Sequence, residues 1–386
     1  MKLMKYHLWR HFGDLKMSRN IIETMDSIFE NIKSLVDDDD ECRITDVKRH
    51  IKAQGDETSV CEFVKHAKVK YLRCVYGLFS LCEYKNQRYL LAFEKYSPGF
   101  SEIGLEIESD STVIQGAAML TMAHGNLPFR KEINSLQIIE SCLGVEPETP
   151  DNPNITFYFS DIANLFVPYC IIKLDDSRFP LIYEEDINRL GCYMFAEDAQ
   201  NLGKSSKERI KGLVLLRSSG TISVSILNSI QSPLMEYTFL QLYQCLEYLF
   251  KLNNCFLIAT GHSLPLEKSI DIVLTHELKV SESENLYSVL KNYASETSID
   301  TMISAIPNCQ PKTAETDKFR IASNYIYRLR CNIAHLRYNQ DDLSNVDWSK
   351  CVDAIIEIIY SVYQQCDSKI NQICMSKNAW KDIFPL

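Results

Sequence analysis

The chain has 386 residues, of which 46% are hydrophobic and 24% charged. This composition is typical of a globular protein and excludes a disordered or fibrous chain, and the length is sufficient for two or three domains. Because the net charge is −10, the overall charge of the protein does not attract nucleic acid. Binding of nucleic acid would therefore need a local basic surface.

The N-terminal region begins with helical patterns. Between residues 20 and 36 apolar side chains recur at helical spacing, which predicts an amphipathic helix whose buried face contains Ile21, Met25, Ile28, Phe29, Ile32 and Leu35. A second, short helix is predicted over residues 47–53, before the break at Gly55.

From about residue 68 to 230 the pattern favours β-strands. Residues 71–84 and 88–96 flank Lys85-Asn86-Gln87 and predict a hairpin, and residues 210–217 and 221–228 flank Ser218-Ser219-Gly220 and predict another. Further strands are predicted over three segments, namely residues 112–123, 155–162 and 167–176. Residues 146–154 are rich in Pro, Asn and Asp and predict a loop.

Beyond Ser232-Pro233 the periodicity becomes helical. Apolar residues repeat at helical spacing from Phe239 to Phe250, and further helices are predicted over residues 266–275, 284–293, 316–337 and 347–367. We therefore predict an α+β protein with two domains. A mixed, β-rich N-terminal domain covers residues 1–230 and has a sensor or regulatory role, and an all-helical bundle covers residues 231–386.

The remaining composition argues against several other classes of protein. Fourteen cysteines are scattered singly, without a C-x-x-C pair or a zinc-type spacing, so we expect reduced thiols in a cytoplasmic protein, no metal site and no cofactor. The chain contains no run of 18 apolar residues, so we predict no membrane-spanning helix. Leu202-Gly203-Lys204-Ser205 is similar to the end of a phosphate-binding loop. That motif also requires a glycine five residues before Gly203, and this position is occupied by Asp198, so the sequence does not predict a phosphate-binding loop.

The segment with the clearest chemistry lies in the predicted helix over residues 316–337. At about 100° per residue, Arg328, Asn332 and His335 share one flank beside the apolar stripe, whereas Arg330 lies about 140° away from His335. An imidazole near an amide and guanidinium groups suits phosphodiester chemistry. The alternative is a helix with an ordinary solvated polar flank. Residues 311–340 contain six basic and two acidic residues, a local net charge of +4 that favours a polyanion.

Arg330-Cys-Asn-Ile-Ala-His335 resembles the R-x4-H signature of HEPN domains, and it lies in the penultimate helix of a predicted bundle, as in that family. A β-rich part followed by such a unit resembles the layout of ApeA-type anti-phage proteins. Two features depart from the family pattern: Cys331 follows the arginine where Asn, His or Asp is usual, and the H-x-Y motif of nucleotidyltransferase-modified toxins is absent.

The resemblance implies a metal-independent endoribonuclease with an RNA substrate, active in defence and responding to a phage-derived trigger. His335 would act as acid or base, Arg330 would stabilise the phosphate, and Asn332 would orient one of them. Arg328 is the alternative arginine, in the R-x6-H form of the motif. Because there is one motif per chain, a homodimer with a composite cleft is implied. Two other interpretations are a catalytically inactive HEPN-like module that binds RNA or protein, and an adaptor in which the motif has no function.

Overall fold

The structure is a computed structural model that describes residues 20–36, 40, 43–45, 47–74, 77–102, 105–124, 127–147, 154–174, 185–275, 280–306, 316–335 and 346–375. The chain divides into two compact units, Met1–Leu181 and Ile182–Leu386. It is mostly helical, with a small antiparallel sheet in the first unit and helices in the second, in agreement with an α+β class.

The first unit contains two sheets and several short helices. In chain order its main elements are α1 (Ile21–Lys33), β1 (Lys48–Lys52), α2 (Glu57–His66), β2 (Lys68–Cys74), β3 (Gly77–Tyr84), β4 (Gln87–Phe93), η2 (Glu94–Tyr96), α3 (Ser97–Glu102), β5 (Glu106–Ile107), α4 (Ser111–His124), α5 (Ser135–Ile138), η3 (Ile139–Leu143), β6 (Asn154–Tyr158), α6 (Phe159–Ala163) and β7 (Tyr169–Leu174).

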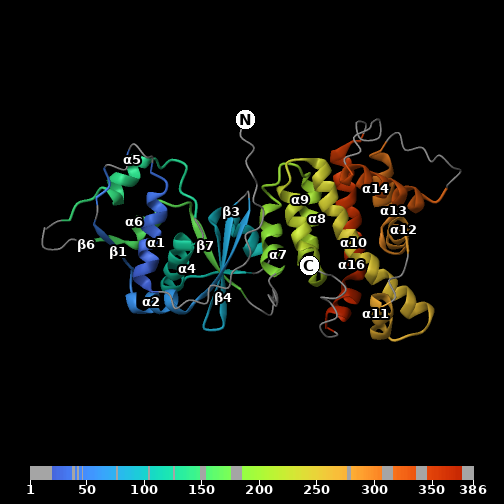
Figure 1. Ribbon diagram of the computed structural model, residues 1–386, viewed down its shortest axis with the longest axis horizontal. Helices are drawn as coiled ribbons and strands as arrows, with labels where there is room; N and C mark the ends of the chain where they lie inside the picture. Colours follow the sequence, from blue (N-terminus) through green and yellow to red (C-terminus); the bar gives the residue numbers. More distant parts are fainter. Residues whose placement is uncertain are drawn as a thin grey trace. The chain divides into compact units, whose positions relative to one another are not determined.

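These elements form layers. Strands β2, β3, β4, β7 and β5 make an antiparallel sheet in that order, and β1 pairs with β6 in a separate parallel sheet. Helix α4 packs on β3, β4 and β7, and α1 packs on both α4 and β1. The two helices therefore lie between the larger and the smaller sheet (Figure 1). Gly116 of α4 allows a close approach to α2, because a Cβ there would lie 2.5 Å from the Phe63 ring.

Several predictions for this unit are confirmed. The helix at residues 20–36 is α1, and its buried side chains include Met25, Ile28 and Ile32. Leu35, which we expected on the buried face, follows the end of the helix and is 47% exposed. The hairpin around Lys85 joins β3 to β4, and Lys85 and Asn86 both have positive φ, as a two-residue turn of this hand requires. Its predicted strands are only partly correct, because the segment 71–84 is divided between the antiparallel strands β2 and β3, and β4 ends at Phe93. The strand predicted over 167–176 is β7. Of the predicted loop, residues 148–153 lie outside the described residues.

Three predictions for the first unit are wrong. Residues 112–123 form helix α4 instead of a strand, because a continuous apolar run does not distinguish a strand from a helix buried on all sides. Residues 48–52 form strand β1 instead of a helix, since pairing with β6 overrides local propensity. The strand predicted over 155–162 ends at Tyr158, where α6 follows.

The second unit is helical throughout its described residues. Its elements are α7 (Glu185–Phe195), α8 (Lys204–Leu215), η4 (Arg217–Ile222), α9 (Ser223–Gln231), α10 (Met235–Gly261), α11 (Leu266–Thr275), α12 (Glu282–Tyr293), α13 (Glu296–Ser304), α14 (Lys318–Ala334) and α16 (Trp348–Met375). The helical bundle predicted from residue 233 is confirmed for its described part, and α13 is an additional helix.

The predicted hairpin over residues 210–228 is wrong. Helix α8 starts at Lys204, ahead of the apolar run, and Ser206, Ile210, Leu213 and Val214 are buried at helical spacing. Buried Arg189 of α7 donates from Nε to the Val214 carbonyl and from Nη2 to the Leu216 carbonyl at the end of α8. Sequence alone does not reveal this tertiary cap for the last carbonyls of a helix.

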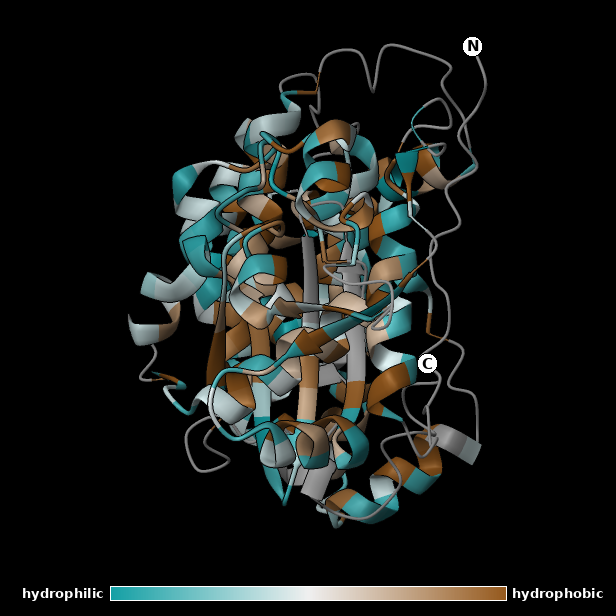
Figure 2. Ribbon diagram, turned by 90° about the vertical axis from the view of Figure 1, so that its left-hand side faces the viewer, coloured by the Kyte–Doolittle hydropathy of each residue, from teal (hydrophilic) through white to brown (hydrophobic). Residues whose placement is uncertain are grey.

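Helices α7 to α9 therefore belong to the second unit, although we predicted a boundary near residue 231. The error follows from the mistaken hairpin, which extended the β-rich domain too far. Long helices α10 and α16 pack against each other at the centre of this unit, where the Tyr363 hydroxyl donates to the Cys245 carbonyl. Helices α12, α13 and α14 lie together beside them (Figure 1). Helices of the first unit, which faces the viewer in Figure 2, carry both hydrophobic and hydrophilic residues, as expected for amphipathic packing.

Candidate active site on helix α14

The motif residues lie at the C-terminal end of helix α14. Asp317 caps the start of the helix by accepting a hydrogen bond from the Phe319 amide. The predicted apolar stripe is buried at Ala322, Ile326, Leu329 and Ile333, whereas Leu336 lies outside the described residues. This stripe orients α14 against α10, α12 and α13, and thereby fixes where the polar flanks of the helix point.

His335 is the residue at which the helix ends. Its backbone φ of −99° and ψ of 12° leave the helical range, and its amide donates to the Cys331 carbonyl. The residue is exposed, and its imidazole makes no hydrogen bond or ion pair with any residue that the structure describes. An exposed imidazole at a helix end can accept or donate a proton without disturbing the core.

Arg330 is held on the opposite side by two carboxylates. Its Nη2 lies 3.2 Å from Oε1 of Glu247 on α10, and its Nε lies 3.3 Å from Oε1 of Glu282 on α12. The Tyr243 hydroxyl donates to the same Glu282 oxygen at 2.8 Å, and the guanidinium carbon is 5.8 Å from the centre of the Tyr243 ring. We call Arg330, Glu247, Glu282 and Tyr243 the Arg330 cluster. It joins three helices.

The Arg330 cluster changes the acidity of its members. Burial raises the pKa of the Glu247 carboxyl, Arg330 opposes that rise, and the neighbouring Glu282 carboxyl adds to it. Burial also raises the pKa of Tyr243, and the hydrogen bond to Glu282 raises it further. For Arg330, burial lowers the pKa, but the carboxylates of Glu282 and Glu247 outweigh this effect. The guanidinium therefore stays charged, and the pKa of the Glu247 carboxyl lies above its usual range.

The other motif residues, Arg328 and Asn332, lie on the flank of the helix that also carries His335. The Arg328 guanidinium carbon is 5.9 Å from the centre of the Tyr325 ring, and Asn332 is half-buried. No contact between described residues joins Arg330 to His335, in agreement with the angle of about 140° between them on the helix. The structure thus separates the two residues of the R-x4-H pattern, and among Arg328, Asn332 and His335 it leaves His335 exposed and the other two half-buried.

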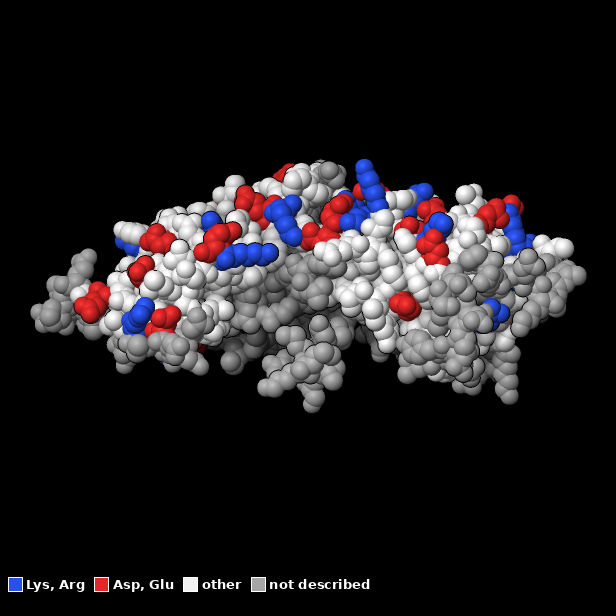
Figure 3. All heavy atoms as spheres, turned by 90° about the horizontal axis from the view of Figure 1, so that it is seen from above, with Lys and Arg blue, Asp and Glu red and all other residues white. Residues whose placement is uncertain are grey.

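Among the described residues of the segment 311–340, several basic side chains pair with acids from other helices. Lys318 pairs with Glu296 and Asp300 of α13, at 2.7 and 3.2 Å. Arg320 pairs with Glu284 of α12 at 2.6 Å. Arg330 likewise has carboxylate partners, Glu247 and Glu282. The local charge in the sequence therefore overstates the attraction of this surface for a polyanion. On the face shown in Figure 3, basic and acidic side chains are likewise intermixed.

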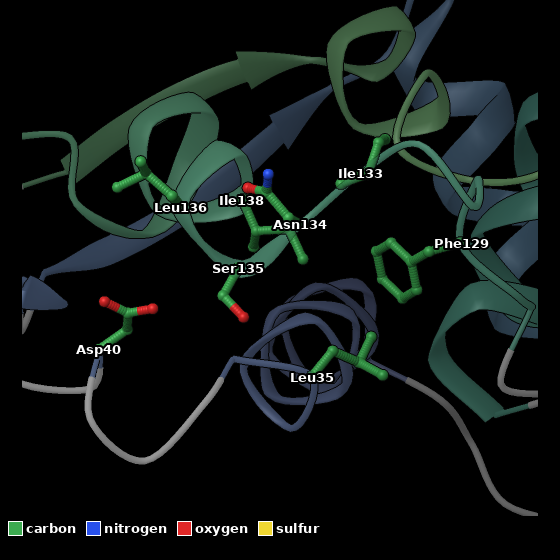
Figure 4. A pocket seen from close by; sticks show the side chains of 8 residues that line it. All are labelled: Leu35, Asp40, Phe129, Ile133, Asn134, Ser135, Leu136 and Ile138. Atoms are coloured by element: carbon green, nitrogen blue, oxygen red, sulfur yellow. The ribbon is translucent and has the colours of Figure 1, made fainter.

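One depression lies in the first unit, away from the motif helix in the sequence. It has a volume of about 490 Å³ and is lined by Leu35, Phe129 and Leu136, with Asp40 at its margin (Figure 4). Asp40 is paired with Arg43 at 3.3 Å. The lining is mainly apolar, and its described residues include no pair of groups that could transfer a proton in concert.

Two further observations limit other chemistries. Among the described residues no group of three or more His, Cys, Asp or Glu is arranged to hold a metal ion. The Gly203-Lys204-Ser205 segment begins α8, where the Ser206 hydroxyl donates to the Asp353 carboxylate of α16. An internal carboxylate thus lies beside Gly203, near the position that a bound phosphate would need.

Sequence reasoning identified Arg330 and His335 but missed the residues that hold Arg330. Glu247 was visible only as a polar position on an amphipathic helix, and Glu282 had no distinguishing pattern. Their roles depend on how α10, α12 and α14 pack together.

No helix in the described part of the chain is both long and apolar enough to span a bilayer. Comparisons with protein-family models, with curated proteins and with solved structures find no match to this chain.

Proposed function

We propose that the protein is a metal-independent endoribonuclease of the HEPN type that acts in anti-phage or toxin-like defence. The observation that carries this proposal is the exposed His335 at the end of α14, one and a half turns after Arg330, within an all-helical set of described residues. The R-x4-H resemblance supplies the reaction class, and the exposed imidazole supplies a group able to perform it.

In the proposed reaction the ribose 2′-hydroxyl is the nucleophile. His335 accepts the 2′-hydroxyl proton as the O2′–P bond forms, or donates a proton to the 5′-oxygen as the P–O5′ bond breaks. An arginine stabilises the negative charge that gathers on the phosphate oxygens, and Asn332 orients the phosphate or the imidazole. The products carry a 2′,3′-cyclic phosphate and a 5′-hydroxyl. DNA has no 2′-hydroxyl and is not cut.

A single histidine does not supply both acid and base in one concerted step. We therefore propose that two chains form a homodimer in which their α14 ends face a common cleft. Arg330 pairs with Glu282 through Nε and with Glu247 through Nη2. A planar guanidinium presents five N–H donors, so the cluster can orient Arg330 while one edge still contacts a phosphate.

The test is RNA cleavage in the presence of EDTA by the full-length chain. We expect His335→Ala to reduce cleavage about 10²- to 10⁴-fold, as for loss of a general acid or base. Arg330→Ala should reduce it comparably, and Arg330→Lys should rescue poorly because an ammonium lacks the planar fork. Arg328→Ala decides which arginine contacts the phosphate. Full activity of His335→Ala, without cyclic-phosphate products, would exclude this mechanism.

The second candidate is a catalytically inactive HEPN-like module that binds RNA or a protein partner. It is favoured by one observation, the pairing of Arg330 with two carboxylates, which compensates the charge that phosphate stabilisation requires. Under this alternative the wild-type protein leaves RNA intact at all EDTA concentrations, and His335→Ala binds its partner as the wild type does.

A further inference from the structure

The first unit presents a basic and aromatic surface that the proposed reaction does not use. In the small sheet, β1 pairs with β6 in parallel, with Lys48 opposite Asn154, His50 opposite Thr156, and Lys52 opposite Tyr158. These six side chains lie on one face of the sheet, because alternate residues of a strand point to the same side. We call this face the Lys48–Tyr158 face.

The opposite face of the same sheet is closed against the core. Ile51, Ile155 and Phe157 are buried, and the Phe157 ring is 5.7 Å from that of Phe29 on α1. Arg49 also lies on this inner side, where its Nε donates to the Cys142 carbonyl. The inner side therefore has a structural role. The outer residues of β6 are all exposed, and Tyr158 has 57% of its surface accessible to solvent.

The charge of the Lys48–Tyr158 face is not compensated like that of helix α14. Neither Lys48 nor Lys52 forms an ion pair with a described residue, and both are exposed. The Lys52 Nζ lies 6.0 Å from the centre of the Tyr158 ring. Two acids contact residues of this face: Glu57 lies 3.2 Å from His50 Nε2, and the Asp161 carboxylate accepts a hydrogen bond from the Tyr158 amide at 3.2 Å. Two lysines thus remain for an external anion, next to an aromatic ring that is open to solvent.

We propose that the Lys48–Tyr158 face binds single-stranded nucleic acid. Lys48 and Lys52 contact phosphates of one strand, and a base stacks on the Tyr158 ring. The two lysines are about 13 Å apart along the strand, so one extended backbone can reach both. An exposed aromatic ring beside basic side chains matches the combination by which proteins bind single strands without reading their sequence. A purely acidic protein partner would use the lysines but would leave the exposed ring without a role.

This inference is independent of the proposed cleavage. If both hold, the first unit captures RNA and the second cuts it. In that case the loss of Lys48, Lys52 and Tyr158 lowers the apparent affinity for RNA, whereas the loss of His335 stops the chemistry. If the chain does not cleave RNA, a binding measurement alone still tests whether the Lys48–Tyr158 face binds a single strand.

The experiment measures fluorescence anisotropy of labelled oligonucleotides with the full chain carrying His335→Ala, so that no substrate is consumed. The probes are a single-stranded RNA, a DNA of the same sequence and the RNA duplex, each over a series of salt concentrations. Lys48→Gln/Lys52→Gln should reduce the slope of log K against log salt by about 1.4, because each phosphate contact on a single strand contributes about 0.7. Tyr158→Ala should weaken single-strand binding about 5- to 150-fold.

The matched controls are exposed residues of the second unit. Lys204→Gln/Lys268→Gln removes two exposed lysines, and Tyr237→Ala removes a tyrosine that is 46% exposed. These variants should bind like the parent, and all variants should melt at the parent temperature. Equal losses in the control variants, unchanged binding in the sheet variants, or no single-strand binding by the parent would each overturn the proposal. Tighter binding of RNA than of DNA would identify RNA as the strand, and equal binding would identify a general single-strand site.

Discussion

Replacing Arg330 with alanine should destabilise the second unit, whether or not Arg330 takes part in catalysis. The substitution removes the partner of both Glu247 and Glu282 and leaves two carboxyls together at a junction of three helices. Loss of cleavage in Arg330→Ala is therefore open to a purely structural explanation, which a stability measurement has to separate from a catalytic one.

The magnitude follows from the geometry of the Arg330 cluster. Exposed ion pairs contribute up to about 1 kcal/mol, and breaking a fully buried one costs about 3–5 kcal/mol. The side chains of Arg330, Glu247 and Glu282 are 26%, 32% and 28% exposed, which is between these cases. We expect a loss of about 2 kcal/mol, taken midway between the two ranges. For a unit of this size that corresponds to a fall of about 4–8 °C in melting temperature.

The effect should depend on pH in a defined direction. Because the folded pKa of Glu247 is raised above 4.5, folding stability falls as the pH rises from the unfolded pKa through the folded one. Arg330 normally opposes that rise, so its removal raises the folded pKa further. The difference in melting temperature between wild type and Arg330→Ala should therefore be larger at pH 8 than at pH 5.

The assay is thermal unfolding followed by circular dichroism, combined with a double-mutant cycle. Adding Glu247→Gln to Arg330→Ala should recover about 1 kcal/mol, since the unpaired carboxyl is gone. Arg328→Ala, on the same helix, is the control and should cost about 1 kcal/mol or less. Identical melting of Arg330→Ala and wild type at pH 8, together with a coupling energy of zero, would refute the reasoning.

Further predictions concern other parts of the chain. His335→Ala should shift stability by no more than about 0.5 kcal/mol, as an exposed residue does, and calorimetry checks this. Burial opposes the lowered pKa of Asp317, but the hydrogen bond from Tyr287 and other contacts outweigh it. Because the folded pKa of Asp317 is below 3.8, the stabilisation by its carboxylate is lost as the pH falls through the folded pKa. Between pH 5 and pH 3 the melting temperature of Asp317→Asn should therefore fall less than that of the wild type. Gly116→Ala should destabilise the first unit by about 1–3 kcal/mol through the clash with Phe63, measured by urea unfolding. Sedimentation at micromolar concentration should give about twice the 44.5 kDa chain mass, and a strict monomer that still cleaves RNA would exclude the composite site.

The local sequence pattern was sufficient to predict a helix where one face of the helix is apolar and the other is polar. The periodicity of residues 20–36 and of α10, α12, α14 and α16 predicted these helices, because their buried stripes are set by the helix repeat itself. The Lys85-Asn86 turn was equally predictable, since both residues tolerate positive φ. In each case the decisive interaction lies within a few residues of the chain.

The sequence pattern gave the wrong secondary structure where an element is buried on all sides, or where it is stabilised by pairing with residues far away in the chain. Helix α4 is apolar on nearly every side, so its sequence does not reveal a period. Strand β1 exists because β6 pairs with it, and these strands are separated by about a hundred residues of chain. The misassigned strands at 210–228 shifted the boundary between units, because an apolar run was considered without the polar first turn of α8.

For the candidate site, the chemical groups available and the flank of the helix that each occupies could be predicted from the order of the residues. The positions of Arg328, Arg330, Asn332 and His335 on α14 follow from the helical repeat. Only the tertiary structure decided their surroundings, because the carboxylates of Glu247 and Glu282 approach Arg330 from α10 and α12. The same packing compensates the basic charge of Lys318 and Arg320. Electrostatic interactions act across space and not along the chain, so the local charge of a segment does not determine the field at a site.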